Sequence, residues 1–433
     1  MDPLIVGLGG IGVLFLLLVI GMPIGYTLAL VGFAGISLIT DPAVAMPTLV
    51  KSFYSTFTQY AFTVIPLFVI MGELATICGL SQGIYDVADK WLRRLPGGLG
   101  IATIGACSGF AAICGSSVAT AATLGRVALP EMQRYGYDRH LATGSVAAGG
   151  TLGFLIPPSI GFVVYGILTE QSIGKLLISG FLPGFLLAAA YVVIIVVWVK
   201  LRPEAAPASP ETVSLKEKLL ALKGVWELAV GFLLVMGGLY LGFFTPTEAG
   251  GIGAFFLFCV TLIKRRLDWT RLRLALQETA KISVMIFMIL AGAYVFTYFM
   301  ALSMIPMRLA GWLTGLDLSP YIILTIILLG YLVLGCFLDA TSMMVLTLPV
   351  IFPAILQLGF DPIWFGVISV LMMEAGLITP PLGLNIFVIS GVAGVPIEVV
   401  FRGSMYFLLA IFAVVVLITI FPQIATVLPA MMR

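Results

Sequence analysis

Two proline pairs, each inside a long apolar segment, constrain the fold of this chain most strongly. The segment Gly153-Phe154-Leu155-Ile156-Pro157-Pro158 is followed, at a separation of 223 residues, by Gly376-Leu377-Ile378-Thr379-Pro380-Pro381. The same separation relates Pro23 to Pro246, Pro130 to Pro353, Gly136 to Gly359, Asp138 to Asp361 and Gly180 to Gly403. A constant offset over this distance indicates an internal duplication. Since proline breaks a membrane helix, each copy is predicted to contain a broken helix.

The composition places the chain in a lipid bilayer. Of its 433 residues, 61% are hydrophobic and 10% are charged, whereas soluble domains carry about 25% charged residues. The net charge of +2 gives no indication of nucleic-acid binding, because the charges are expected in loops. The five cysteines lack CxxC spacing, His140 is the single histidine, and no specific nucleophile–base arrangement appears, so the sequence does not suggest an enzyme.

Apolar periodicity predicts an all-α polytopic membrane protein. A span needs about 20 apolar residues. Ten spans are predicted: 4–20, 22–40, 62–79, 139–170, 176–199, 227–243, 248–263, 279–303, 362–391 and 402–428. Two further stretches, about 98–134 and 320–358, have polar centres, Gly115-Ser116-Ser117 and Asp339-Ala340-Thr341-Ser342. We expect each to be a re-entrant helical hairpin, since irregular backbone at membrane depth requires cover by protein or a cavity.

The distribution of basic residues predicts the orientation. Residues 200–225 form a polar linker between the halves, and a cytoplasmic linker would place most of the 22 Lys and Arg residues inside. Both termini would then be periplasmic and the halves would be inverted repeats, with a binding site at their interface. Segments 80–97 and 304–318 are expected to be helices in the membrane interface, although ordinary polar loops would fit them equally well.

Broken helices and hairpin tips could bind ions and carboxylates. A break exposes carbonyl groups, which suit a small hard cation such as Na⁺, and N–H groups, which suit a carboxylate. Hydroxyl oxygens come from Ser116, Ser117, Thr341 and Ser342, and a formal charge from Asp339. A carboxylate at membrane depth is functional by default. Three alternatives remain open. The hydroxyls could only cap helices, Glu73 and Glu374 could relay protons or form structural hydrogen bonds, and Arg126 could attract an anionic substrate or extend to the interface.

The chain resembles the large membrane subunit of tripartite ATP-independent periplasmic (TRAP) transporters over nearly its whole length. Five segments carry the resemblance: Ile65-Pro66-Leu67-Phe68, Gly115-Ser116-Ser117-Val118-Ala119-Thr120, Gly153 to Gly161, Phe337-Leu338-Asp339-Ala340-Thr341-Ser342, and Gly376 to Asn385. The resemblance implies an elevator-type, Na⁺-coupled importer of an organic acid, such as a C4-dicarboxylate or sialic acid, in a bacterial inner membrane. It also implies a separate small membrane subunit and a periplasmic substrate-binding protein as partners.

In such a transporter, Na⁺ sites form between each hairpin tip and the facing helix break. By matching motif, the first site would use Ser116 and Ser117 with backbone oxygens at Gly153, Ile156 and Pro158. The second would use Asp339, Thr341 or Ser342 with Gly376, Thr379 and Pro381. Arg126 and Asn385 would be candidates for substrate contact.

The interpretation as an elevator-type transporter also divides the chain into domains. Residues 61–180 and 279–403 would form the moving transport domain. Residues 1–60, 181–226, 227–278 and 404–433 would form the static scaffold and the linker. Two other functions stay open: a stand-alone Na⁺- or H⁺-coupled carboxylate transporter that needs no binding protein, and a membrane scaffold or assembly protein.

Overall fold

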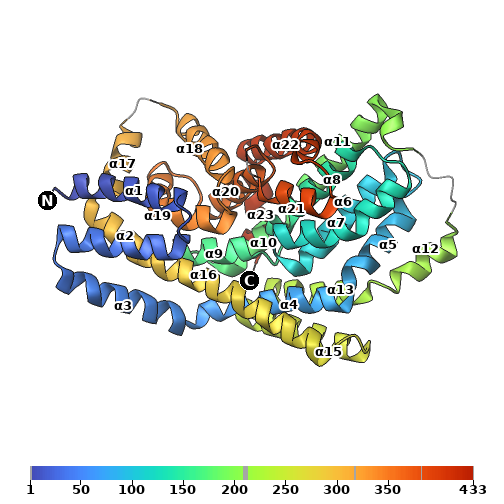
Figure 1. Cartoon of the computed structure of the whole chain (residues 1–433), viewed down its shortest axis with the longest axis horizontal. Helices are drawn as coiled ribbons and strands as arrows, with labels where there is room; N and C mark the ends of the chain where they lie inside the picture. Colours follow the sequence, from blue (N-terminus) through green and yellow to red (C-terminus); the bar gives the residue numbers. More distant parts are fainter. Residues whose placement is uncertain (1, 208–212, 316–317, 382, 433) are drawn as a thin grey trace.

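The computed structural model describes residues 2–207, 213–315, 318–381 and 383–432, and every regular element within them is helical (Figure 1). The first half contains α1 (Pro3–Val19), α2 (Ile24–Ile39), α3 (Pro42–Thr58), α4 (Val64–Cys78), α5 (Leu80–Leu92), α6 (Gly98–Cys114), α7 (Ser117–Arg134), α8 (Arg139–Leu155), α9 (Ile160–Thr169), α10 (Ile173–Ser179), α11 (Phe181–Leu201) and α12 (Leu215–Leu222). The second contains α13 (Trp226–Phe232), α14 (Gly238–Tyr240), α15 (Pro246–Ile263), α16 (Trp269–Ser303), α17 (Ile305–Thr314), α18 (Pro320–Gly335), α19 (Ala340–Gln357), α20 (Pro362–Leu377), α21 (Leu384–Ala393), α22 (Ile397–Ile420) and α23 (Gln423–Met431). Short 3₁₀ turns lie at Tyr60–Thr63 and Pro203–Ala205, and a π-helical turn at Leu233–Gly237 joins α13 to α14. The predicted all-α class is confirmed for this part of the chain.

The internal duplication extends to the helix bounds. Helices α7 and α19 begin and end 223 residues apart, and so do the first residues of α8 and α20. Both of these latter helices begin in the same way. The carboxylate of Asp138 accepts hydrogen bonds from the N–H groups of His140 and Leu141, at 2.9 and 3.1 Å. Asp361 caps α20 likewise, at 2.9 Å to the N–H of Ile363 and 2.8 Å to that of Trp364. The two copies therefore share start signals that a sequence can specify locally.

Helix pairs occur where the two hairpins and the first broken helix were predicted, whereas re-entrance of the hairpins stays a prediction. Helices α6 and α7 meet at Gly115, α18 and α19 meet near Asp339, and α8 and α9 are bent by 42° at the first proline pair. Six helices of the described residues are long and apolar enough to cross a membrane, or up to eight if each of two bent pairs is one span. The chain is thus a multi-pass membrane protein, whereas the count of ten spans, the inversion of the halves and the orientation of the termini stay predictions.

Three elements differ from the sequence-based expectation. Residues 42–58 form helix α3, and the predicted linker contains helix α12, which begins with a capping box between Ser214 and Glu217. The helix expected at 279–303 is the C-terminal part of α16, which runs unbroken from Trp269 to Ser303. The predicted domain boundary between residues 278 and 279 therefore falls inside a continuous helix, and that between 403 and 404 falls inside α22. The remaining division into domains is not tested by the helix bounds.

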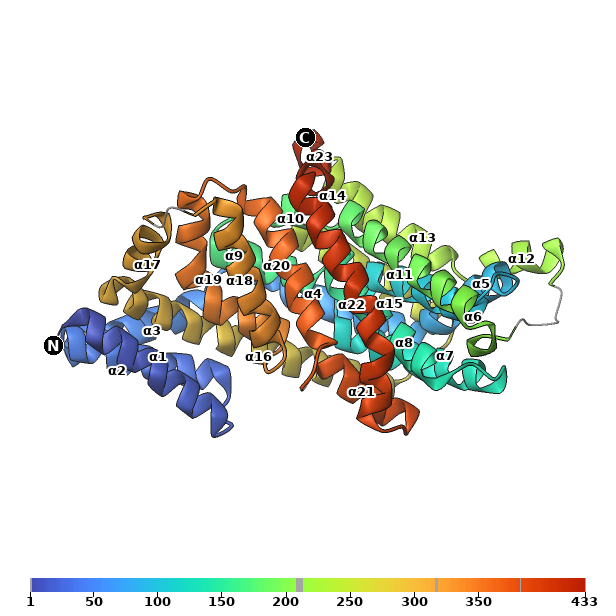
Figure 2. The same cartoon turned by 90° about the horizontal axis from the view of Figure 1, so that it is seen from above.

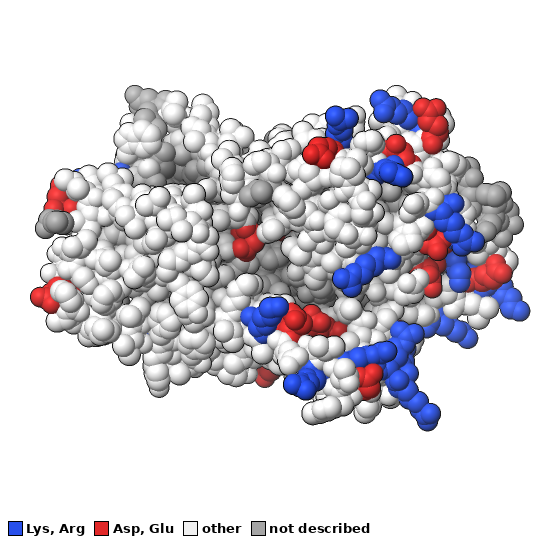
Figure 3. Space-filling model, in the orientation of Figure 1, with Lys and Arg blue, Asp and Glu red and all other residues white. Residues whose placement is uncertain are grey.

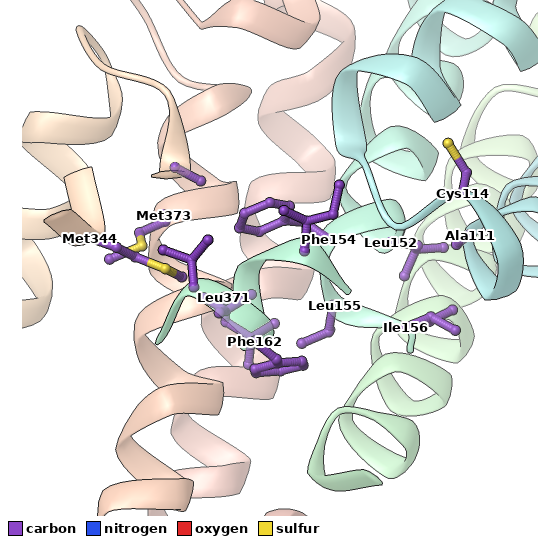
Figure 4. Close-up of a cluster of buried hydrophobic side chains, with 14 of the residues drawn as sticks. Ala111, Cys114, Leu152, Phe154, Leu155, Ile156, Phe162, Met344, Leu371 and Met373 are labelled. Atoms are coloured by element: carbon purple, nitrogen blue, oxygen red, sulfur yellow. The ribbon is translucent and has the colours of Figure 1, made fainter. Parts of the chain in front are cut away.

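Both halves contribute to one apolar core around the first helix break. Figure 2 shows α22 running beside α20, and α22 is in contact with both α8 and α20. In Figure 4, the buried side chains of Phe154 and Phe162 from the first half lie near Met344 and Leu371 from the second. The break is therefore held inside the protein, where its irregular backbone is tolerated. On the face drawn in Figure 3, Lys and Arg gather around α5, α12 and the end of α15. The left part of this face, around α1 to α3, is largely uncharged.

Candidate functional site

The tip of the first hairpin is docked on the first helix break. Gly115 ends α6 with a positive φ of 67°, which favours glycine. A Cβ built there would lie 2.5 Å from the carbonyl oxygen of Pro158. The N–H of Ile160 in turn donates to the carbonyl of Gly115 at 3.3 Å. Only a residue without a side chain allows this approach of two irregular backbones.

The same tip touches α8 at Gly153. A Cβ on Gly153 would lie 2.5 Å from the carbonyl oxygen of Ser116 and 2.6 Å from Oγ1 of Thr120. That hydroxyl oxygen is buried and lacks a hydrogen-bond partner in the described structure. Thr120 was not among the predicted site residues, although its position four residues after Ser116, one turn along α7, could have indicated it.

The first predicted site is thus brought together from three segments. Carbonyl oxygens of Ser116 and Pro158 and the unpaired hydroxyl of Thr120 lie around the glycines that allow the contact. Ile156 lies buried at the break, and its N–H donates to the carbonyl of Leu152 at 2.8 Å. Neutral oxygen donors of this kind suit a hard monovalent cation. The residues present therefore fit Na⁺, although their role as ligands stays a prediction.

Ser117 makes a contact that crosses between the two halves. Its hydroxyl donates to Oε1 of Glu374 at 2.7 Å, and the Glu374 side chain is buried in α20. The second carboxylate oxygen has no hydrogen-bond partner among the described residues. From the sequence, Glu374 could relay protons or form a structural hydrogen bond, and no contact with the first tip was predicted.

The second tip is arranged differently. Asp339 caps α19, and its carboxylate accepts hydrogen bonds from the N–H of Ser342, at 3.0 Å, and from the hydroxyl of the same residue. Thr341 and Ser342 are buried, whereas Asp339 is half-buried. Asp339 and Ser342 line a cavity of about 780 Å³ whose other walls are the turn between α1 and α2 and one face of α16. A carboxylate is therefore presented to an open space next to the predicted scaffold.

The second break does not meet its tip in the way that the first does. A Cβ on Gly376 would lie 2.5 Å from Cα of Gly335, at the end of α18. The hydroxyl of Thr379 donates to the carbonyl of Ala375 at 2.6 Å, and Pro381 is exposed. Within the described residues, no hydrogen bond joins Asp339, Thr341 or Ser342 to residues 376–381. The predicted members of the second site are therefore not joined to one another by hydrogen bonds between the tip and the break in the described structure.

Arg126 and Asn385, the candidates for substrate contact, lie in different surroundings. Arg126 is exposed and lines a cavity of about 550 Å³ together with Arg139, Gln133 and the residues that end α21. Asn385 is fully buried at the start of α21; its amide nitrogen donates to the carbonyl of Ala147 at 3.4 Å, and its oxygen is unpartnered in the described structure. The guanidinium of Arg126 can thus be reached by a small anion, whereas the side chain of Asn385 is packed in the interior.

Comparison with solved structures supports the architecture. The YdaH transporter of Alcanivorax borkumensis matches with a TM-score of 0.60, covering 89% of this chain and 90% of that chain at 15% sequence identity. The two chains therefore share their overall fold.

Sequence comparison defines the family. Residues 11–424 match the DctM component of the tripartite ATP-independent periplasmic transporters. The C4-dicarboxylate TRAP transporter large permease protein DctM of Pseudomonas aeruginosa is 37% identical over 378 residues, which cover 87% of this chain and 88% of that protein. The sialic acid TRAP transporter large permease protein SiaM of Vibrio cholerae is 29% identical, with 97% of each chain covered. The chain belongs to the TRAP transporter large permease family, as its resemblance implied.

Another relative differs in length. The isethionate TRAP transporter permease protein DctMQ of Oleidesulfovibrio alaskensis is 33% identical over 415 residues, and the match covers 95% of this chain but 65% of that protein. The chain thus corresponds to about two thirds of that permease.

Proposed function

We propose that this chain is the membrane pathway of a Na⁺-coupled importer of an organic acid, delivered by a periplasmic substrate-binding protein in the bacterial inner membrane. The observation that carries the proposal is the docking of the first hairpin tip on the broken helix α8–α9, with oxygen atoms directed at the contact. The relatives named for C4-dicarboxylates and sialic acid support a carboxylate as the substrate. The DctMQ relative, of which this chain matches about two thirds, supports a small membrane subunit as a component of the same transporter.

The proposed mechanism uses the tips as ion-dependent contacts. Bound Na⁺ would supply positive charge that neutralises the carbonyl and carboxylate oxygens between tip and break. Ser116, Thr120, Gly153 and Pro158 would hold the first ion, and Asp339 with the α19 cap would hold the second. Ordered tips then fix the N–H ends of the broken helices, which favour a carboxylate. Ion and substrate are therefore expected to raise each other's affinity.

The transport step is proposed to be an elevator movement. In it, the helices that carry the tips and breaks, α6–α9 and α18–α21, move together past the scaffold. The shared core around Phe154, Met344 and Leu371 supports movement as one body, because closely packed interiors deform little.

Uptake into proteoliposomes tests the proposal. The chain and its small subunit are reconstituted, and entry of a radiolabelled organic acid is measured under an imposed Na⁺ or H⁺ gradient, with and without the binding protein. We expect uptake only with inward Na⁺ and the binding protein together. Uptake without that protein would identify a stand-alone carboxylate transporter, uptake driven by H⁺ would contradict sodium coupling, and no uptake under any condition would favour a scaffold role.

Arg126 provides a separate test of substrate contact. Because its side chain is exposed in a cavity and has no carboxylate partner among the described residues, Arg126→Ala is expected to raise the KM for the acid by roughly 10-fold, the worth of one charge-assisted contact. Arg126→Lys should recover part of this loss, and the Na⁺ dependence should not change. The nearby exposed Arg134, whose guanidinium lies 4.0 Å from Glu131, serves as the matched control. Equal KM values in all variants would remove Arg126 from the substrate path.

A further inference from the structure

The two hairpin tips differ in charge, although their helices correspond. With the 223-residue offset, Ser116 corresponds to Asp339, and both residues cap the helix that follows the tip. The second tip thus carries a carboxylate at its cap, and the first carries a neutral hydroxyl. A cation held by carbonyl and hydroxyl oxygens alone would lack a counter-charge on its own hairpin.

A carboxylate from the other half reaches the first tip. Glu374 lies in α20, immediately before the second break, and its Oε1 accepts the hydrogen bond from Ser117 at 2.7 Å. Ser117 is the next residue to Ser116, whose carbonyl faces Gly153. Adjacent Cα atoms are about 3.8 Å apart, so the carboxylate is held at the residue that directly follows Ser116 on the same tip.

The surroundings of Glu374 leave its charge without a protein counter-ion. The residue is 1% exposed, and within the described residues it forms no ion pair with Lys or Arg. Its Oε2 has no hydrogen-bond partner there, and the nearby α7 also carries the unpaired hydroxyl of Thr120. Burying an unpaired carboxylate is costly unless a compensating positive charge is present. The N-terminus of α7 supplies a partial one, and a bound cation would supply the rest.

Symmetry supports the same assignment. The residue that corresponds to Glu374 in the first half is Thr151, whose hydroxyl is paired with the hydroxyl of Tyr191 at 2.8 Å. The first half thus carries a hydroxyl where the second half carries the carboxylate of Glu374. The carboxylate that is hydrogen-bonded to the first tip, Glu374, and the one that caps the second, Asp339, therefore both come from the second half of the chain.

We propose that Glu374 is the counter-charge of the first cation site and reaches it across the interface between the two halves. The inference rests on the proposed sodium coupling and deepens it. It gives occupancy of the first tip a direct effect on α20 at the second break, since the same carboxylate belongs to both. Glu374 acts through charge and through its hydrogen bond to Ser117, as a positioning residue.

Glu73 is the competing carboxylate. It lines a cavity of about 190 Å³ together with Ser116 and Cys114, on the α4 side of the tip. Its side chain is only half-buried, and no hydrogen bond from it to the tip occurs in the described structure. Solvent therefore screens its charge more than that of Glu374. Glu73→Gln is the matched control for a carboxylate near the same tip.

The experiment measures Na⁺ binding without transport. The full chain is purified into lipid nanodiscs, and its unfolding temperature is followed by tryptophan fluorescence during Na⁺ titration at constant ionic strength. Glu374→Gln is expected to raise the half-saturating Na⁺ concentration on the order of 10- to 100-fold. Ser117→Ala keeps the charge and should raise it by a few-fold, about the value of one hydrogen bond. Glu73→Gln should leave it within about 2-fold of the wild type, since Glu73 is half-buried and forms no hydrogen bond to the tip in the described structure.

Relocating the charge provides the decisive variant. Ser116→Asp combined with Glu374→Gln gives the first tip the arrangement of the second, and it should recover most of the lost Na⁺ affinity. If Glu374 had only a packing role, Glu374→Gln would lower the unfolding temperature equally at all Na⁺ concentrations, and Ser116→Asp would restore nothing. Either result would overturn the inference while wild-type Na⁺ dependence persisted. A wild type that shows no response to Na⁺ would instead overturn the proposed sodium coupling, and the inference with it.

Discussion

Replacing Asp339 with asparagine is expected to raise the Na⁺ concentration for half-maximal uptake by about 100-fold, while the protein remains folded. Asparagine caps helices as well as aspartate does, so α19 keeps its start. What disappears is one formal charge beside the proposed second ion. At an effective dielectric constant of about 20, a unit charge a few Å from an ion contributes several kcal/mol, and about 1.4 kcal/mol is a factor of ten in affinity.

The measurement is organic-acid uptake as a function of Na⁺ concentration, with the unfolding temperature of each variant recorded in parallel. Asp41→Asn is the matched control, because Asp41 caps α3 through the N–H of Ala43 at 2.7 Å and lies outside both tips. We expect this control to keep wild-type Na⁺ dependence. An Asp339→Asn variant with an unchanged Na⁺ midpoint would remove the second tip from the ion path.

The sequence predicted the local architecture well because the signals for it are local. Asp138 and Asp361 predict the starts of α8 and α20, and the proline pairs predict where those helices end. The polar centres at Ser116 and Asp339 marked the turns between hairpin arms, since a cap residue there accepts N–H groups of the next helix. Such features depend on a few neighbouring residues and need no knowledge of tertiary packing.

Helix extent was harder to predict where apolar and charged residues alternate. The charged segment 269–278 continues as helix into α16, and residues 42–58 form α3 despite an internal proline, Pro47. Helix α16 packs closely on α2: a Cβ on Gly292 would lie 2.2 Å from the carbonyl oxygen of Gly25. Contacts of this kind come from segments more than 250 residues apart and cannot be read from hydropathy.

The candidate site shows the same division. The contact between Gly153 and Ser116 was predictable from motif, since each residue lies at a break or a tip. The link from Ser117 to Glu374 spans 257 residues, and the unpaired hydroxyl of Thr120 becomes visible only when α8 is placed against α7. Pairing between the halves is set by packing, which local sequence does not encode.

Gly153→Ala is expected to abolish measurable uptake, by a factor of about 100 or more, with little loss of folded protein. The added Cβ would lie 2.5 Å from a backbone oxygen of Ser116 and 2.8 Å from its carbonyl carbon. A flexible side chain could rotate away from such a contact, but backbone at a helix cap has to shift as a unit. A displacement of about 1 Å at a site built from fixed oxygens is enough to cost about 100-fold in function.

Gly391→Ala is the matched control for this substitution. Gly391 also lies in a helix of the proposed transport domain, α21, but a Cβ there would meet no atom within 4 Å. Alanine is the better helix former, so this variant should fold and transport like the wild type. For Gly153→Ala, the Na⁺ midpoint of thermal stabilisation should rise together with the loss of uptake, because the same contact forms the tip–break interface and belongs to the proposed first ion site. Wild-type uptake by Gly153→Ala would show that the tip need not approach α8 so closely, and loss of uptake with an unchanged Na⁺ midpoint would separate the docking of the tip from ion binding.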